Sequence, residues 1–194
     1  MNELNLTMPI IGKKLPDLPV DVFFNERIEK KKLSDYAGKW LVLFFYPADF
    51  TFICPTELRE MADMYSEFQK IDTEILSVSC DTAFVHKAWH DGSPAIKEVK
   101  FPMAADPSGV LARALGVYIA EEGLSLRGTF IVSPEGMIKS MEVNDNSIGR
   151  TASEVFRKLQ AAQYVAAHGG EVCPASWKPG QSTLKPGVDL VGKI

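Results

Sequence analysis

One stretch of the chain constrains its fold more than any other: a buried strand followed, after a short loop, by an amphipathic helix. Residues 39–46 contain a continuous apolar run rich in β-favouring residues, which predicts a buried strand. Apolar residues then recur at helical spacing, and Pro55 suits the first helical position because it lacks an amide hydrogen. The pattern therefore predicts a helix over residues 55–70 with Cys54 as its cap.

The predicted place of Cys54 has a chemical consequence. At the N-terminus of a helix, a side chain lies near free backbone N–H groups and the positive end of the helix dipole. Both favour the thiolate over the thiol, and the thiolate is the nucleophile. We therefore interpret Cys54 as a reactive cysteine. The alternative is a small buried hydrophobe, as many cysteines are.

The rest of the chain alternates strand and helix patterns. A second apolar run completes a β-α-β unit, which should be parallel and right-handed. Two β-rich runs flank the turn sequence Ser-Pro-Glu-Gly, the signature of a hairpin, and the last helix opens at Thr151 with capping-box spacing. The expected elements after the first helix are strands over residues 75–79, 103–105, 129–132 and 137–143, and helices over residues 82–90, 107–114 and 151–168.

These elements predict an α/β protein with a thioredoxin-like fold, in which a reactive cysteine normally lies at the start of the helix after the first core strand. Prolines and a glycine over residues 4–19 indicate an extended N-terminal extension with one short strand at most. The prolines and glycines that follow Gly169 and Gly170 indicate a C-terminal arm. We expect a domain of residues 1–168 and an arm of residues 169–194.

Composition excludes several classes of function. A chain of 194 residues suits one domain with an arm, and its formal net charge of −4 gives no attraction toward nucleic acid or an anionic membrane. The basic run at residues 30–32 is expected in a solvated loop or turn. No targeting or membrane-spanning segment is visible, and three cysteines do not form a structural disulfide framework. A cytoplasmic location is the expectation.

Four further residues are candidates for chemistry beside Cys54. The Thr51 hydroxyl could reach back to the sulfur or to a bound oxygen, or could only stabilise a turn. Glu57 has the position of the acidic residue in a capping box, which is a structural role. Cys173 lies in the arm, where a thiol can move to meet a sulfenic acid or can be idle. Cys80 ends an apolar run and is expected to be a buried core thiol.

No metal or cofactor site is predicted. His86 and His90 are four residues apart, a spacing that can hold a metal on one helix face, but no third ligand is evident nearby. The sequence also lacks the glycine-rich patterns of phosphate-binding and dinucleotide-binding loops.

The loop before the predicted helix resembles the active-site signature of the peroxiredoxins, Pro-x-x-x-Thr-x-x-Cys, here Pro47, Thr51 and Cys54. The surrounding residues are similar to those of the typical 2-Cys group, and the ending Val-Asp-Leu-Val-Gly-Lys-Ile is similar to the bacterial alkyl hydroperoxide reductase C branch of that group. The similarity covers nearly the whole chain. It includes the segments that begin at His86, Arg127, Gly149 and Gly170.

The resemblance implies a thiol peroxidase without a cofactor, which reduces hydrogen peroxide and organic hydroperoxides in antioxidant defence. Cys54 would be the peroxidatic cysteine and would become a sulfenic acid. Cys173 would be the resolving cysteine, forming a disulfide with Cys54 of the partner subunit. Pro47 would shield the sulfur. Thr51 and Arg127 would bind the peroxide, Arg127 would also favour the thiolate, and Glu57 and Arg150 would support the site.

The resemblance also implies partners. A flavoprotein disulfide reductase or a thioredoxin-like protein would reduce the disulfide again. The chain would form an antiparallel homodimer, and five such dimers could form a ring, a decamer. Neither nucleic acid nor a membrane is expected as a partner.

Two other functions are alternatives to the peroxidase. A thiol–disulfide oxidoreductase of the thioredoxin type usually has a Cys-x-x-Cys motif, and the residue three positions after Cys54 is Glu57. A holdase chaperone formed by the ring could coexist with peroxidase activity.

The sequence also predicts resistance to over-oxidation. Sensitive family members have a Gly-Gly-Leu-Gly insertion before the third strand and a Tyr-Phe pair in the C-terminal helix. Here residues 95–101 read Ala-Ile-Lys-Glu-Val-Lys-Phe, and the ending lacks Tyr-Phe. We expect fast disulfide formation and little sulfinic acid at Cys54. Mass spectrometry after modest peroxide exposure checks this, and ready sulfinylation of Cys54 would contradict it.

Overall fold

The computed structural model describes residues 10–194, which fall into two compact units. One unit ends at Arg150, and the other is Thr151–Ile194. The part of the expected N-terminal extension that precedes residue 10 lies outside the described residues. The division into a peroxidase domain of residues 1–168 and an arm stays a prediction.

The first unit is an α/β structure. Its described elements are β1 (Pro19–Phe24), β2 (Arg27–Lys32), a 3-10 helix (Leu33–Tyr36), β3 (Trp40–Phe45), α1 (Cys54–Lys70), β4 (Thr73–Ser79), α2 (Ala83–Gly92), a 3-10 helix (Ile96–Glu98), β5 (Met103–Ala105), α3 (Val110–Ala114), β6 (Tyr118–Ile119), β7 (Leu124–Ser125), β8 (Arg127–Val132) and β9 (Ile138–Asn144).

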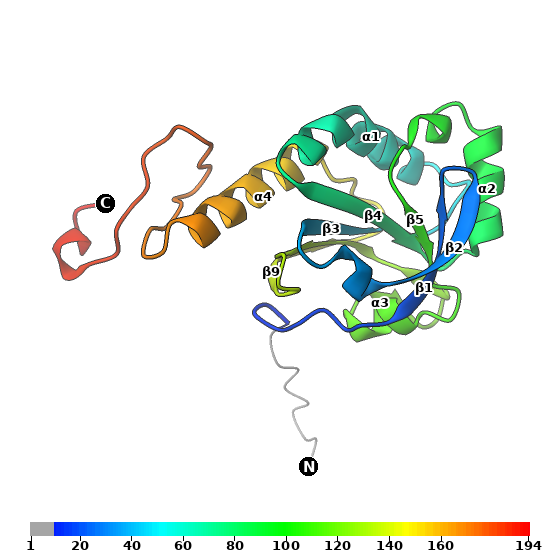
Figure 1. The fold of residues 1–194 in the computed structure, drawn as a ribbon, viewed down its shortest axis with the longest axis horizontal. Helices are drawn as coiled ribbons and strands as arrows, with labels where there is room; N and C mark the ends of the chain where they lie inside the picture. Colours follow the sequence, from blue (N-terminus) through cyan, green and yellow to red (C-terminus); the bar gives the residue numbers. More distant parts are fainter. Residues whose placement is uncertain (1–9) are drawn as a thin grey trace, which may run out of the picture. The chain divides into compact units, whose positions relative to one another are not determined.

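Seven of these strands form one mixed sheet in the order β2-β1-β5-β4-β3-β8-β9. The central strands β5, β4 and β3 are parallel to one another, and β1 and β8 pair with them antiparallel on either side. Figure 1 shows α1 over one face of the sheet and α3 over the other. The expected parallel β-α-β unit, β3-α1-β4, and the hairpin β8-β9 are therefore confirmed, as is the thioredoxin-like fold.

The burial of β3 explains its unbroken apolar run. Every residue of β3 is buried. Leu41, Leu43 and Phe45 belong to the same core cluster as Leu111 and Ala112 of α3. Because side chains alternate along a strand, the residues between them point to the opposite face. A strand covered on both faces needs no polar positions.

Four features of the first unit differ from the predictions. The basic run at residues 30–32 lies in β2, where an exposed, charged edge strand resists pairing with other chains. The hairpin β1-β2 and the short pair β6-β7 were not predicted. The helix expected from residue 107 begins only at Val110, after Gly109 in a left-handed conformation.

The second unit contains α4 (Ala152–Ala167) and an arm with one 3-10 helix (Val188–Leu190). Thr151 is the N-cap of α4, but its side chain forms no capping hydrogen bond, so the expected capping box does not form. Trp177 is buried in this unit: its ring lies 4.9 Å from that of Tyr164, and its indole N–H donates to the Gln181 carbonyl at 3.1 Å. No described helix is long and apolar enough to span a bilayer.

Candidate active site

Cys54 lies at the carboxyl edge of the parallel strands, where the loop after β3 enters α1. Ile53 is the N-cap and Cys54 is the first helical residue, so the helix begins one residue earlier than predicted. Cys54 is fully buried. The sulfur therefore cannot meet a second thiol unless the structure opens around it.

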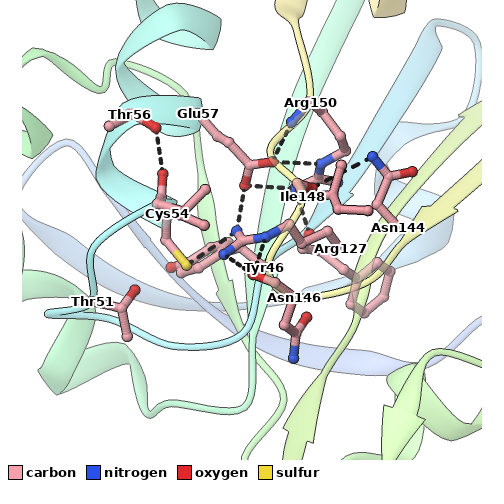
Figure 2. A network of polar contacts seen from close by, with 12 residues as sticks. Tyr46, Thr51, Cys54, Thr56, Glu57, Arg127, Asn144, Asn146, Ile148 and Arg150 are labelled. Atoms are coloured by element: carbon pink, nitrogen blue, oxygen red, sulfur yellow. Dashed lines mark hydrogen bonds and ion pairs between the residues drawn. The ribbon is translucent and has the colours of Figure 1, made fainter.

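The donor at the sulfur is a guanidinium group rather than the backbone amides expected from the sequence. The amides of Thr56 and Glu57 donate to the Ile53 carbonyl, at 2.9 and 3.2 Å, and are thus already paired. Arg127 Nη1 lies 3.4 Å from Cys54 Sγ and donates to it (Figure 2). A positive charge at this distance stabilises negative charge that develops at the sulfur or at an oxygen bound to it.

The sheet topology brings Arg127 to Cys54. β8 pairs with β3 antiparallel, with Phe44 opposite Thr129. The beginning of β8 therefore lies beside the end of β3, where the chain turns toward Cys54. Arg127 is the first residue of β8, and its Nε and Nη2 both donate to the Asn146 carbonyl, at 3.0 and 2.9 Å.

Glu57 joins Arg127 to a second arginine. Its carboxylate accepts from Arg127 Nη1 at 2.7 Å and from Arg150 Nε and Nη2 at 2.9 and 3.1 Å (Figure 2). The Arg150 amide donates to the same carboxylate at 2.8 Å. Glu57, Arg127 and Arg150 are all buried. Glu57 thus orients the two arginines. Its carboxylate binds them and does not act as part of a capping box.

The buried cluster places positive charge beside the sulfur. Its two guanidinium groups and one carboxylate carry one positive charge in sum. Two carboxylates outside the cluster also interact with its arginines, Glu142 with Arg150 and Asp145 with Arg127. The sulfur itself lies against the guanidinium group of Arg127.

Arg150 fastens the cluster to the sheet. Its Nη1 donates to the Gly128 carbonyl and the Thr129 hydroxyl at 3.0 and 2.9 Å, and its Nη2 donates to the Phe45 carbonyl at 2.8 Å. Its guanidinium also lies 3.6 Å from the centre of the Phe44 ring. Burial lowers the pKa of Arg150 from its ordinary value, and the Glu57 carboxylate counteracts that effect.

The loop between β3 and α1 contains the other two residues of the signature. Pro47 is buried and Thr51 is partly buried. The Thr51 hydroxyl donates to the Ala48 carbonyl at 2.8 Å and not to the sulfur. Since that bond uses its only proton, the Thr51 oxygen is left as a hydrogen-bond acceptor.

The other cysteines lie in different surroundings. Cys173 is partly buried in the second unit, 3.9 Å from the Ala161 carbonyl. Burial and then the Glu171 carboxylate raise the pKa of Cys173, while Arg157 lowers it. Cys80 is half-buried rather than fully buried as expected, and burial with nearby Asp106 and Asp81 raises its pKa to about 11. Cys80 is therefore a thiol at neutral pH.

The histidine pair does not form a shared site. His86 is fully buried and bonded to Asp49 and to the Ala104 carbonyl. Among the described residues, the group with metal-ligand spacing is Glu26, His90 and Asp91, and Lys87 Nζ already binds both of its carboxylates, at 3.0 and 2.8 Å.

Sequence patterns alone identify only part of this cluster. Cys54, Pro47 and Thr51 lie in one signature, whereas Arg127 and Arg150 are identified only through the family resemblance. The Asn146 carbonyl that holds Arg127 was missed, because a backbone acceptor leaves no mark in the sequence. The pairing of Glu57 with both arginines was likewise not visible.

Comparisons with known proteins agree with this geometry. Residues 11–141 match the model of the AhpC/TSA family, and residues 161–193 match the C-terminal domain of 1-Cys peroxiredoxin. Alkyl hydroperoxide reductase C of Pseudomonas aeruginosa is 50% identical over 187 residues, which cover 96% of this chain and 100% of that protein. Its counterpart in Escherichia coli K12 is 49% identical, with the same coverage.

Solved structures give the same result. The crystal structure of Enterococcus faecalis AhpC has a TM-score of 0.84 and 49% identity, and the match covers 86% of this chain and 100% of that one. The reduced 2-Cys peroxiredoxin of Plasmodium vivax has a TM-score of 0.89 and 28% identity, with 94% and 96% covered. The chain therefore belongs to the AhpC/TSA family, and it is a peroxiredoxin, a thiol-dependent peroxidase.

Proposed function

We propose that Cys54 is the peroxidatic cysteine of this peroxidase and that its substrates are hydrogen peroxide and organic hydroperoxides. The observation that supports this most is the contact of Arg127 Nη1 with Cys54 Sγ at 3.4 Å inside a buried cluster of two guanidinium groups and one carboxylate. Such a cluster stabilises a thiolate and also an oxygen on which negative charge develops.

In the first step, the Cys54 thiolate attacks the terminal oxygen of the hydroperoxide, and the O–O bond breaks. The sulfur becomes a sulfenic acid, and the leaving oxygen takes up a proton as water or an alcohol. Thr51 accepts a hydrogen bond from the peroxide O–H, since its own proton is used on Ala48. Arg127 donates to the peroxide oxygens, Pro47 shields the site from water, and Glu57 and Arg150 keep Arg127 in place.

In the second step, the Cys173 thiolate of one subunit attacks the Cys54 sulfenic acid of the other, and the hydroxyl group takes up a proton from solvent and leaves as water. Because Cys54 is buried at the start of α1, the first turn of that helix must open for the disulfide to form. Opening one terminal turn is a low-cost motion. A dithiol protein, either a flavoprotein disulfide reductase or a thioredoxin-like protein, then reduces the disulfide.

The same proposal includes the assembly and its location. A homodimer is required by the disulfide between subunits, and we infer a ring of five dimers in the cytoplasm. Three aromatic side chains of the first unit are exposed in the single chain and are candidates for contacts in the assembly: Phe52 is 92% exposed, Phe84 is 75% exposed, and Phe50 is 60% exposed.

Replacement of each proposed cysteine should stop the cycle at a different point. Cys54→Ser should abolish peroxide turnover, because no other described thiol has a cationic donor at its sulfur. Cys173→Ser should allow one peroxide reduction per chain and then stop, without a disulfide-linked dimer. Peroxide consumption with a dithiol reductant and non-reducing electrophoresis measure these outcomes. Cys80→Ser serves as the matched control and should leave both unchanged; turnover by Cys54→Ser would refute the assignment.

The disulfide-forming step should accelerate as the pH rises. Burial and Glu171 raise the pKa of Cys173, so at neutral pH most of this group is protonated, and only the thiolate attacks. Below that pKa the rate should increase about tenfold per pH unit. Rapid-mixing kinetics of disulfide formation from pH 6 to 9 would measure it.

Two charge variants test the cause of this pH dependence. Glu171→Gln removes a carboxylate that raises the pKa of Cys173 and should speed the step at pH 7, whereas Arg157→Gln removes a cation that lowers it and should slow the step. A rate that does not vary with pH, or equal shifts in both variants, would contradict this account.

Arg127→Lys should slow the reaction of Cys54 with peroxide by about 100-fold, because a lysine cannot contact the sulfur, Glu57 and Asn146 together. Single-turnover kinetics in the Cys173→Ser background isolate this step. The matched control is Arg59→Lys in α1, an exposed arginine paired with Asp63. If both substitutions change the rate equally, Arg127 has no special role.

A further inference from the structure

A buried hydrogen-bonded group lies next to the active-site loop and has no part in the mechanism above. It consists of Tyr46, Asp49 and His86, and all three residues are buried. Asp49 Oδ1 accepts from the Tyr46 hydroxyl at 2.7 Å, and Asp49 Oδ2 lies 2.8 Å from His86 Nδ1. Asp49 belongs to the loop that contains Thr51, whereas His86 belongs to α2. The group thus ties the loop to a helix.

The protons of this group can be assigned from its partners. His86 Nε2 lies 3.1 Å from the Ala104 carbonyl, which can only accept, so Nε2 donates. The contact between His86 Nδ1 and Asp49 Oδ2 also needs a proton, since two lone pairs would repel each other at 2.8 Å. With that proton, histidine and aspartate together are neutral, which suits a fully buried pair. Burial raises the pKa of Tyr46, so its hydroxyl remains a donor.

The backbone of the loop is fixed at the same residue. The Asp49 amide donates to Asp81 Oδ2 at 2.8 Å, and the Ser79 hydroxyl donates to the same oxygen at 2.7 Å. Asp49 is therefore held through both its side chain and its amide.

Phe50, the residue after Asp49, has a backbone conformation that the surrounding structure must hold in place. Phe50 has a φ of 54°, in the left-handed region that a bulky side chain rarely adopts. A conformation of this kind persists only where the surrounding structure enforces it. It turns the chain between Asp49 and Thr51, so a loop released at Asp49 would relax at Phe50 and displace Thr51.

We propose that Asp49 is a positioning residue for the peroxide reaction: bonded to Tyr46 and His86, it holds Thr51 where the threonine oxygen can bind the peroxide at Cys54. This inference rests on the proposed roles of Cys54 and Thr51. It assigns no contact with the substrate to Asp49, which acts through Thr51 alone.

The test measures the second-order rate constant of Cys54 oxidation by hydrogen peroxide in the Cys173→Ser background, where the later steps are absent. Thr51→Val and Asp49→Ala should each slow oxidation by about tenfold, the factor expected for loss of one hydrogen bond to the reacting group. Because both act through the same oxygen, the double variant should be no slower than Thr51→Val alone. A merely structural role for Asp49 would instead give losses that multiply.

Asp49→Asn provides a conservative rescue. Its amide N–H can donate to a neutral His86 Nδ1 while its carbonyl oxygen still accepts from Tyr46, so the loop stays tied. We expect the rate constant of Cys54 oxidation in this variant to lie within about threefold of that in the protein with Asp49 intact. A tenfold loss in Asp49→Asn would mean that the charge of Asp49, not its hydrogen bonds, is what matters, and would overturn the proposal.

A pair of tyrosine variants tests the proposal even if Asp49→Ala folds poorly. Tyr46→Phe and Tyr65→Phe each remove one hydroxyl bond of 2.7 Å to a carboxylate, to Asp49 and Glu74 respectively. Both should unfold at slightly lower temperature, but only Tyr46→Phe should slow oxidation. Equal rates in both variants would refute the proposal.

The variants distinguish a failure of the proposed function from a failure of the positioning role of Asp49. If Cys54→Ser still reduces peroxide, the proposed function is wrong. If Cys54 in the Thr51→Val variant is oxidised at the normal rate, the proposed role of Thr51 is wrong. Suppose that those variants behave as expected, but the rate constant of Cys54 oxidation in Asp49→Ala is normal, or the losses of Asp49→Ala and Thr51→Val multiply in the double variant. Then only the positioning role of Asp49 is wrong.

Discussion

The buried carboxylate of Glu57 between two guanidinium groups is the interaction on which the rest of the site depends. It accepts from Arg127 and Arg150, which come from different segments, and so determines where the cation at Cys54 lies. Removing one member of such a cluster leaves a buried charge without a partner, at a cost of about 3–5 kcal/mol. The same arrangement places the Arg127 guanidinium against the sulfur. Stability and reactivity therefore have a common electrostatic origin here.

Burial of Cys54 imposes two opposing requirements on this region. Exclusion of water strengthens the interaction of Arg127 with the sulfur, because charges interact more strongly in a medium of low dielectric constant. The later disulfide requires the same sulfur to leave its pocket. Placing Cys54 in the first turn of α1 reconciles the two, since a helix end can open while the buried strand β3 and the remainder of α1 stay folded.

Local patterns in the sequence were sufficient for the main elements. The apolar run of β3, the spacing in α1 and the Ser-Pro-Glu-Gly turn each predicted an element close to the observed one. Short or polar elements were missed: β2 is a charged edge strand, and α3 is cut short by Gly109 in a left-handed conformation. In these places neighbouring strands and backbone geometry outweigh side-chain periodicity.

The sequence by itself determined that a cysteine stands where a strand passes into a helix, because that depends on residues adjacent in the chain. Only the tertiary structure decided what surrounds the sulfur. The amides of Thr56 and Glu57 are used by Ile53, and the positive charge comes from Arg127, 73 residues further along the chain. Such contacts arise from the antiparallel pairing of β8 with β3, and strand pairing between distant segments has no signal in local sequence.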